Sequence, residues 1–544
     1  MGALLLGMVS CSLDREPETT LTDAAFWKTE GDLRAACNRL YQQMTGQLGG
    51  YWHDYRADDM CGTSPNSISN GQRVVPSESG DWTDPYWRIY ISNNILQKAP
   101  KATVTEEVLN KYLAEARFFR AFHYFELVKK YGDVPLLLKA IDNTADEALT
   151  MPRTPREEVI QQCYADLEFA AEWLPAIDKV SQWGLVSRSA ALAMIVRVGL
   201  YEGTYSKYHS LSGGSWQAHL QKAISAAQTM ISEGKHELYP DFQKLFLFDG
   251  EGRQNKENVF VKTYGPNGQG TTTHNNSRKM ENEVTVTRSL VDMFLYTDGL
   301  PMEKSPLRIT PETAYMDVFA NRDPRMAMTL YQLDEDAYKG AFKPFAFRYG
   351  YNLKKGFDLN EWTTNSKETI DKMVIRYAEV LISYAEALYE LNGKISDEDL
   401  NLTVNALRRR VGMPAMLTNS FVTTNGLNML EEIRRERTIE FIDENKRYDD
   451  IIRWKIAEKV LPVAMLGAKY TFEESGISAE NFSGLLTETG GMYKGQKLHS
   501  EADLYVLEVA STRTFDPSRD YLYPIPLKEI TLSGGNIVQN PNWN

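Results

Sequence analysis

The stretch EEVLNKYLAEARFFRAFHYFELVKKYGDVPLL, residues 106–137, decides the fold class of this 544-residue chain. Its apolar side chains recur every three or four residues, which is the period of an α-helix. One apolar stripe consists of Phe118, Ala121, Phe122, Phe125 and Val128. Tyr112 and Phe119 add a second stripe, so we expect neighbours to cover this helix on two sides. Gly132 and the nearby Pro135 are expected to end it.

The same kind of pattern recurs along the chain. Further helices are predicted within residues 30–44, 81–96, 188–205, 375–393 and 399–412. In the second of these, Thr83 or Asp84 is expected to cap the first turn before Pro85, and Trp87 to lie in the core. Helix pairs joined by short turns are the unit of a helical-repeat solenoid. The prediction is therefore a mostly α-helical scaffold of about four tetratricopeptide-like helix pairs, based on helix pairing because the repeat consensus itself is not matched.

Residues from about 210 to 372 differ in composition from the predicted helices. Gly, Asn and Thr are frequent and aromatic residues alternate with polar ones, which predicts a loop-rich segment with a few short strands. No linker rich in Gly and Ser, or in Pro, interrupts the chain. We therefore expect residues 12–544 to form one unit, with helical parts at 22–209 and 373–544 around this segment.

The charge and the cysteines exclude several classes of protein. Lys and Arg total 60 against 73 Asp and Glu, a net charge of -13, so the chain would repel a phosphate backbone and no nucleic-acid partner is expected. The four cysteines have no Cys-x-x-Cys spacing, which argues against zinc and thioredoxin-type motifs. A disulfide between Cys37 and Cys61 stays open, because sequence does not fix its geometry.

The first eleven residues, MGALLLGMVSC, form an apolar run that ends at Cys11. The run is much shorter than the about 20 residues that a membrane-spanning helix needs. An apolar run that passes through a small residue into a cysteine is typical of a bacterial lipoprotein signal. Residues 1–11 are therefore predicted to be such a signal, with Cys11 as the lipidation site. No Lys or Arg precedes Cys11, so an unstructured leader is the alternative.

Five segments together resemble the signature segments of the SusD/RagB family. They are EARFFRAFHYFELVKKYGDVPLL (115–137), VIRYAEVLISYAEAL (374–388), NALRRRVGMP (405–414), EIRRERTIEFIDENKRYDDIIRWK (432–455) and YLYPIPLKEITLSGGNIVQNPNW (521–543). They occur in the order of the family and extend over nearly the whole chain. Family members are outer-membrane lipoproteins of Bacteroidetes that capture nutrients for a partner transporter.

The resemblance implies a location, a partner and an activity. Cys11 would carry the lipid anchor, and Asp14 and Glu16 resemble the acidic residues that mark export to the cell surface. The protein would face the cell exterior on the outer membrane and act as the lid of a SusC-like TonB-dependent β-barrel. It would trap oligosaccharide between lid and barrel without enzymatic activity.

No motif for catalysis or cofactor binding is present in the sequence. HExxH, GxSxG and P-loop patterns are absent, and we predict no catalytic residue, no cofactor and no metal site. The charge-rich run at residues 434–454 is interpreted as a helix held by ion pairs, because Asp449 and Arg453 stand four residues apart. Capture of a ligand is therefore the better interpretation.

A neutral oligosaccharide needs flat aromatic rings beside amide, carboxylate and guanidinium groups on loops that a rigid scaffold holds. Two regions offer this mixture: residues 51–82, and residues 264–282 together with Trp362. Trp82 and Trp362 are predicted as stacking platforms. The predicted ligand-binding residues are Trp82, Asp58, Asp59, Asn66, Tyr264, Asn276 and Trp362.

Each of these predictions has a structural alternative. Trp82 is equally explained as a hydrophobic staple that packs on Trp87. Asp58 and Asp59 are also explained as turn caps, and His274 as a solvated loop residue. For the whole chain, the alternatives are capture of peptides as in the RagB branch, a glycoside hydrolase, or a solenoid that binds only its barrel.

Overall fold

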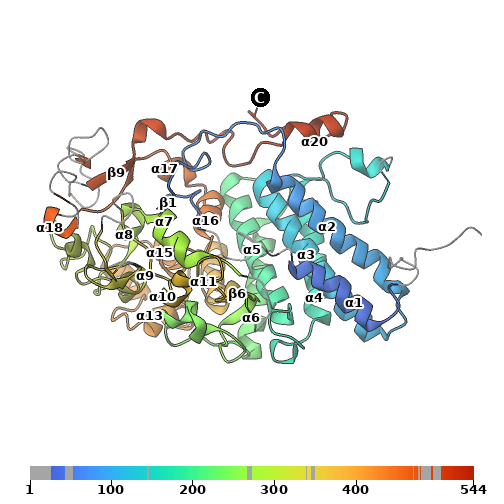
Figure 1. Ribbon diagram of the computed structural model, residues 1–544, viewed down its shortest axis with the longest axis horizontal. Helices are drawn as coiled ribbons and strands as arrows, with labels where there is room; N and C mark the ends of the chain where they lie inside the picture. Colours follow the sequence, from blue (N-terminus) through green and yellow to red (C-terminus); the bar gives the residue numbers. More distant parts are fainter. Residues whose placement is uncertain are drawn as a thin grey trace, which may run out of the picture.

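Helices dominate the computed structural model of the chain, and only a few short strands accompany them (Figure 1). The prediction of a mostly α-helical fold is confirmed. The structure describes residues 26–42, 44, 53–143, 146–265, 273–338, 340–344, 350–469, 471–475, 478, 492–493 and 504–543. The predicted signal, Cys11 and the acidic residues after it lie outside these ranges.

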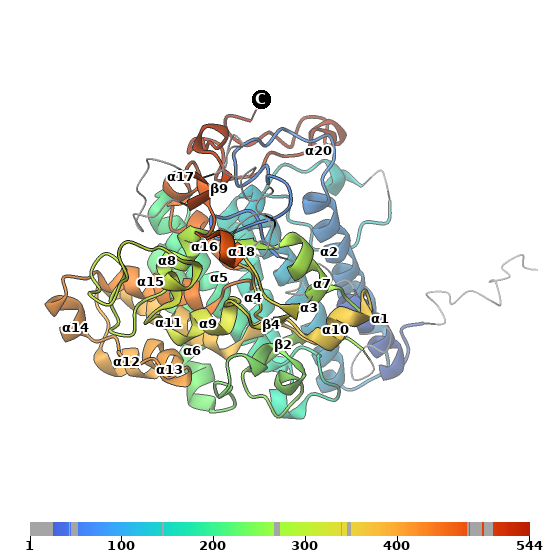
Figure 2. The same ribbon diagram turned by 60° about the vertical axis from the view of Figure 1, so that its left-hand side comes forward.

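The long helices pack on one another in chain order (Figures 1 and 2). They are α1 (Glu30–Gln42), α2 (Gly80–Lys98), α3 (Glu106–Tyr131), α4 (Arg156–Trp173), α5 (Arg188–His209), α6 (Trp216–Glu233), α11 (Tyr377–Asn392) and α15 (Met429–Glu440). Helix α3 packs on both α2 and α4, α5 on α4 and α6, and α11 on α6 and α15. This succession of neighbouring helices is the arrangement of a helical-repeat scaffold.

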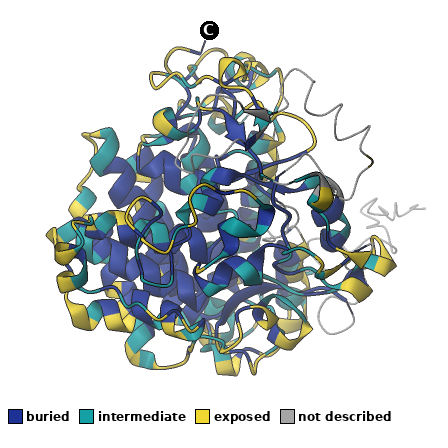
Figure 3. Ribbon diagram, turned by 90° about the vertical axis from the view of Figure 1, so that its left-hand side faces the viewer, coloured by how far each residue is buried: buried dark blue, intermediate teal, exposed yellow. Residues whose placement is uncertain are grey.

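Helix α3 forms as the periodicity predicts. The Thr105 hydroxyl accepts a hydrogen bond from the Val108 N–H at its start. At its end Gly132 has φ 73°, a conformation that favours glycine. Both apolar stripes are buried, and the ring of Phe118 contacts the rings of Phe119 and Phe260 in edge-to-face geometry. Figure 3 shows how much of this helical interior is buried.

Small residues bring α5 close to α6. A Cβ placed on Gly199 would lie 2.6 Å from the carbonyl oxygen of His219, and one on Gly203 would lie 2.6 Å from the Leu220 side chain. Glycine at these two positions therefore permits the close helix packing.

Shorter elements form the rest of the described structure. The further α-helices are α7 (Asn276–Glu283), α8 (Arg288–Met293), α9 (Pro324–Thr329), α10 (Leu359–Thr364), α12 (Asp397–Leu402), α13 (Val404–Arg410), α14 (Asn419–Thr424), α16 (Arg447–Arg453), α17 (Ala457–Val460), α18 (Phe472–Ser475) and α20 (Leu527–Leu532). Several 3-10 turns connect them. None of the described helices is long and apolar enough to cross a membrane.

The strands form four small antiparallel sheets. The pairs are β1 (Met60–Cys61) with β3 (Thr285–Val286), β2 (Asn258–Lys262) with β6 (Lys372–Arg376), and β4 (Asp336–Ala337) with β5 (Gly340–Ala341). In the fourth, β9 (Leu504–Glu508) lies between β7 (Met465–Leu466) and β8 (Met492–Tyr493). The first two sheets join segments far apart in sequence and so tie the loop-rich segment to the helices.

Three local predictions were wrong. Helix α2 begins at Gly80 and is capped by Ser79, so Pro85 lies in its second turn and not its first. Helix α6 lies within residues 210–372, so the helical part extends to residue 233 before the loop-rich segment begins. The predicted helix at 399–412 is broken at Thr403, whose backbone angles are not helical, into α12 and α13.

The cysteines of the described chain are buried thiols, and no disulfide joins Cys37 to Cys61. The Cys37 thiol lies 3.7 Å from the carbonyl oxygen of Tyr112, inside the helical core. Burial raises the pKa of Cys37 well above its ordinary value. Cys37 is therefore a packing residue and not a reactive thiol.

The charge-rich run at residues 434–454 is held by buried ion pairs, as predicted. Its pairing differs in detail, because Asp449 binds Lys129 at 2.5 Å and Arg453 binds Glu386 and Asp450. Glu386 is fully buried and accepts bonds of 2.6 and 2.7 Å from Arg453. The run is therefore part of the scaffold.

This pairing predicts a dependence of stability on pH. Burial alone would raise the pKa of Glu386, but the charge and hydrogen bonds of Arg453 outweigh it and lower the pKa to about 2. A lowered carboxyl pKa stabilises the fold above the unfolded value near 4.5, and this stability is lost as the pH falls toward 2. The loss should be on the order of 3 kcal/mol.

Urea unfolding between pH 2 and pH 7 measures this effect. The Glu386→Gln variant keeps the shape of the side chain and removes its charge, so its free energy of unfolding should fall less steeply with acid than that of the wild type. Parallel pH profiles of the two proteins would show that Glu386 does not contribute in this way.

Candidate ligand-binding cleft

Two concavities lie on opposite faces of α2. The first, which we call the cleft, has a volume of about 700 Å³. It is lined by residues of the segment 53–68, one face of α2 from Gly80 to Arg88, the segment 444–453, Tyr523, and facing side chains of α3, α5, α7, β6, α11 and α15. Both sequence regions predicted to bind ligand thus contribute to its wall, the second through Lys279.

Many charged side chains of the cleft are committed to the fold. The guanidinium of Arg56 donates bonds of 2.8 and 2.7 Å to Asp54. Lys129 bridges Glu126 and Asp449, and Lys130 binds Asp81 at 2.6 Å. Because these charges neutralise one another, the cleft does not favour a ligand of one strong charge.

Other polar groups of the cleft are not used by the described fold. The guanidinium of Arg88, which is half-buried, has no hydrogen bond or ion pair among the described residues. The amide of Asn445, the hydroxyl of Tyr55 and Nε2 of His53 are buried and find no hydrogen-bond partner there. Buried polar groups normally have partners, so these groups are suited to hydrogen bonding with a ligand or with water.

Burial also lowers the pKa of basic groups in the wall. It lowers the pKa of Arg88 from its ordinary value and that of His123 well below its ordinary value. Burial and the neighbouring charge of Arg197 lower the pKa of Lys446 to about 8. At neutral pH, His123 therefore contributes a neutral imidazole to the wall.

Of the seven predicted binding residues, Asn66 lines the cleft. Its side-chain oxygen accepts hydrogen bonds from the N–H groups of Ile68 and Ser69, which leaves the amide nitrogen for a ligand. Asp58 instead binds Arg447 through both carboxylate oxygens, at 2.7 and 2.8 Å. The structure therefore does not support Asp58 as a hydroxyl partner.

Asp59 and Trp82 are buried. The Asp59 carboxyl lies in the interior, at 4% exposure, and this burial raises its pKa well above its ordinary value. Trp82 is 3% exposed and packs against Tyr86 and Tyr131 at centroid distances of 5.3 and 4.9 Å. Trp82 is among the residues that line the second of these concavities, but at 3% exposure its ring offers too little surface to support it as a stacking platform. The structure does not support a staple on Trp87 either.

Tyr264, Asn276 and Trp362 lie in the loop-rich segment and do not line the cleft. Tyr264 and Asn276 are buried beside His274. His274 is itself buried, so the interpretation of it as a solvated loop residue was wrong. The indole N–H of Trp362 donates to Glu281 at 2.5 Å, and the guanidinium of Arg278 covers its ring at 3.8 Å. The ring of Trp362 is therefore already stacked within the protein.

The second concavity, which we call the groove, has a volume of about 630 Å³ on the other face of α2. Apolar residues dominate its wall. Trp87 is 51% exposed and stacks on Tyr90 with ring centroids 5.4 Å apart and planes 10° apart. The Tyr90 hydroxyl donates to Asp142 at 2.7 Å. The prediction that Trp87 lies in the core was wrong.

Comparisons with known proteins define the class of this chain. Residues 245–543 match the model of the SusD family, and residues 21–200 match a model described as starch-binding and associating with the outer membrane. Since the first match spans more than half of the chain, the chain belongs to the SusD family. The predicted family is confirmed.

Individual relatives agree with this assignment. A SusD-like protein of Formosa agariphila, SusD-like protein P2, is 26% identical over 99% of this chain and 98% of its own length. A SusD-like carbohydrate binding protein of Bacteroides fragilis has a TM-score of 0.72 at 24% identity, over 93% of this chain and 99% of its own. Surface glycan-binding protein A of Bacteroides fluxus has a TM-score of 0.62 at 21% identity, over 95% and 100%. These two structures share the fold.

Sequence reasoning missed Arg88, Asn445, Tyr55 and His53. Tyr55 and His53 lie in a region that was predicted to bind ligand, so its polar and aromatic composition was a usable signal. Arg88 is the residue after Trp87 in α2, and Asn445 lies within a run interpreted as scaffold. Their approach to one another depends on tertiary packing, which the sequence pattern does not reveal.

Proposed function

We propose that this protein captures an oligosaccharide in the cleft and does not change it chemically. The observation that supports this most is that Arg88, Asn445, Tyr55 and Asn66 offer hydrogen-bonding groups around a cleft of about 700 Å³ in which most other charges are paired. Amide, phenol and guanidinium groups match the hydroxyl groups of a neutral sugar. Two structural neighbours are named for carbohydrate or glycan binding, which agrees with this choice.

Three carboxyls of the cleft favour binding over hydrolysis. A glycoside hydrolase needs two carboxyls across the scissile bond, one of them kept protonated by a raised pKa. Burial alone would raise the pKa values of Asp81, Glu379 and Asp449, but the charges of Lys130, Arg197 and Lys129 outweigh it and lower them. These three carboxyls are therefore poor general acids.

The setting of this activity is a second part of the proposal, and membership of the SusD family supports it. We propose that the protein is attached to the outer membrane through lipid on Cys11, faces the cell exterior, and forms the lid of a SusC-like TonB-dependent β-barrel to which it delivers oligosaccharide. Closure of the lid would then require that ligand favours the closed over the open arrangement.

Affinity electrophoresis of the full chain through gels containing single polysaccharides, with a peptide digest as competitor, tests the proposal. We expect at least one glycan to retard the protein and the peptides to leave this unchanged. Incubation with the same glycans should release no new reducing ends. Retardation abolished by the peptides would favour the RagB-like alternative, and sustained release of reducing ends would indicate a hydrolase.

A further inference from the structure

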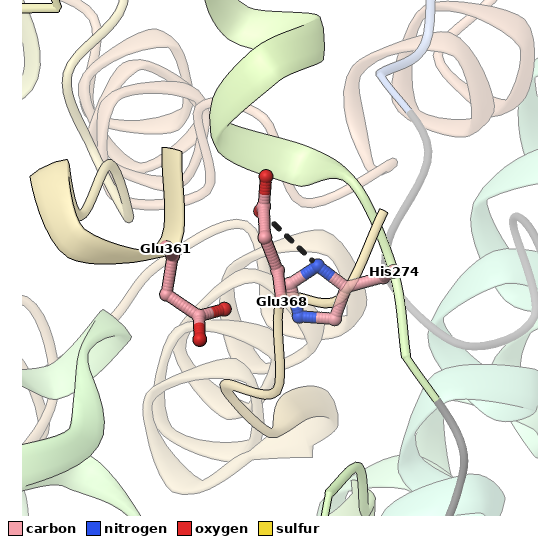
Figure 4. A group of neighbouring side chains, drawn as sticks. All are labelled: His274, Glu361 and Glu368. Atoms are coloured by element: carbon pink, nitrogen blue, oxygen red, sulfur yellow. Dashed lines mark ion pairs between the residues drawn. The ribbon is translucent and has the colours of Figure 1, made fainter. Parts of the chain in front are cut away.

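A buried cluster outside the cleft and the groove combines one histidine with two glutamates. His274 precedes α7, Glu361 lies in α10, and Glu368 follows α10 (Figure 4). All three side chains are buried, and one ligand atom from each lies within 4.8 Å of the others. Figure 4 shows the carboxylate of Glu361 directed toward the other two side chains. Exposed acidic groups often gather without function, but burial of two carboxylates together is costly.

The backbone fixes the orientation of His274. Its Nε2 lies 2.9 Å from the carbonyl oxygen of Ile370. A carbonyl oxygen only accepts, so Nε2 carries the proton, and in the neutral ring Nδ1 carries the lone pair. Nδ1 lies 3.4 Å from Oε2 of Glu368 and accepts a long hydrogen bond of 3.3 Å from the N–H of Asn276, which a cation bound to Nδ1 would replace. A histidine whose second nitrogen donates to a backbone carbonyl is the usual arrangement of a metal ligand.

Backbone N–H groups hold both carboxylates in place. Glu368 accepts from the N–H groups of Ser277 at 2.7 Å and Arg278 at 3.3 Å, in the first turn of α7. Glu361 accepts from the N–H of Thr369 at 2.5 Å. Oε2 of Glu361 also accepts from the N–H of Ile370 at 3.4 Å, and Oε1 accepts from the Thr369 hydroxyl at 3.3 Å. A carboxylate oxygen has two lone pairs, so the capacity of Glu361 for a cation lies at Oε1. The positions of the three side chains are therefore set by the fold, as a preorganised ligand set requires.

The donor set indicates the kind of cation. One imidazole nitrogen with two carboxylate oxygens suits a first-row transition cation, whereas Mg²⁺ and Ca²⁺ favour oxygen ligands alone. Bonds of about 2.0–2.1 Å in a tetrahedral zinc site place neighbouring ligand atoms about 3.4 Å apart. The separation of Nδ1 of His274 from Oε2 of Glu368 has this value.

We propose that His274, Glu361 and Glu368 bind one divalent transition cation, with Zn²⁺ as the best match. The ion would join the start of α7 to α10 and the segment after it, and would offset two buried negative charges. The charge of the nearby Lys372 also acts on both glutamates. Charge balance by this lysine, without a metal ion, is therefore the alternative to the proposal. The proposed role is structural and independent of ligand capture in the cleft.

Equilibrium dialysis of the EDTA-treated full chain against Zn²⁺, with the bound metal measured by mass spectrometry, tests this proposal. We expect about one Zn²⁺ per chain, and affinity weakened at least about tenfold in His274→Ala and in Glu361→Gln. His236→Ala is the matched control. His236 is also buried with a ring nitrogen 2.9 Å from a backbone carbonyl, that of Lys256, but it is not part of the cluster.

Thermal unfolding provides the second readout. The wild type and His236→Ala should melt at higher temperature with Zn²⁺ than with EDTA, while Glu361→Gln should melt at the same temperature in both. A wild-type chain that binds no stoichiometric Zn²⁺ would overturn the proposal. Equal binding and equal thermal shifts in His274→Ala, Glu361→Gln and His236→Ala would also overturn it, since the ion would then lie elsewhere.

Discussion

Replacing Arg376 with alanine should lower the free energy of unfolding by about 3–5 kcal/mol. Arg376 is buried, and its guanidinium donates to Glu257 at 2.8 Å, to Glu440 at 2.6 Å and to Glu444 at 2.7 Å. Its plane also lies 4.2 Å from the ring of Phe441. Removal of the cation leaves the buried carboxylates of Glu257 and Glu440 and the partly buried one of Glu444 with less positive charge around them. Burial of an unpaired charge is strongly unfavourable.

Urea unfolding of Arg376→Ala beside Lys256→Ala measures this difference. Lys256 binds Glu237 at 2.7 Å, but the two side chains are about half exposed or more, so its loss should cost less than about 1 kcal/mol. A similarly small loss in Arg376→Ala would mean that the buried network contributes little to stability.

Replacing Phe118 with alanine should also cost about 3–5 kcal/mol, through lost burial and the cavity left behind. Phe118 is 0% exposed and lies among the rings of Phe119, Phe122 and Phe260. Because Phe260 belongs to β2, the substitution removes a contact between the helical scaffold and the first strand after α6.

Phe248→Ala is the control for this change, since Phe248 is 46% exposed and should change the free energy of unfolding by less than about 0.5 kcal/mol. Equal losses in the two variants, measured by urea unfolding, would contradict the assignment of Phe118 to the core of the scaffold.

The helical fold was predictable because its signal is local. The two apolar stripes on α3 are recognised from spacings of three or four residues, and the glycine at its end is recognised by itself. The errors arose where local signals compete. Ser79 and Thr83 are both good caps, and the structure uses Ser79. Trp87 has the spacing of a core residue. Because α2 has a concavity on each face, however, Trp87 lines the groove and stays half exposed.

The site was predictable as a region and not as a set of residues. Composition indicated the segment 51–82, and the cleft does lie against it. The roles of Asp58 and Trp82 depend on distant partners, Arg447 and Tyr131, which the sequence does not place beside them. A side chain whose partner lies tens or hundreds of residues away is indistinguishable in sequence from one that is left for a ligand.

We propose that sugar binds in the cleft and not in the groove. Calorimetric titration of the glycan selected by electrophoresis into wild type, Arg88→Ala and Trp87→Ala distinguishes the two sites, since these neighbouring residues line the two concavities separately. The proposal predicts that Arg88→Ala binds at least about tenfold more weakly, a loss of about 1.4 kcal/mol, while Trp87→Ala binds as the wild type does. Loss of binding in Trp87→Ala with full binding in Arg88→Ala would contradict the proposal and place the sugar in the groove.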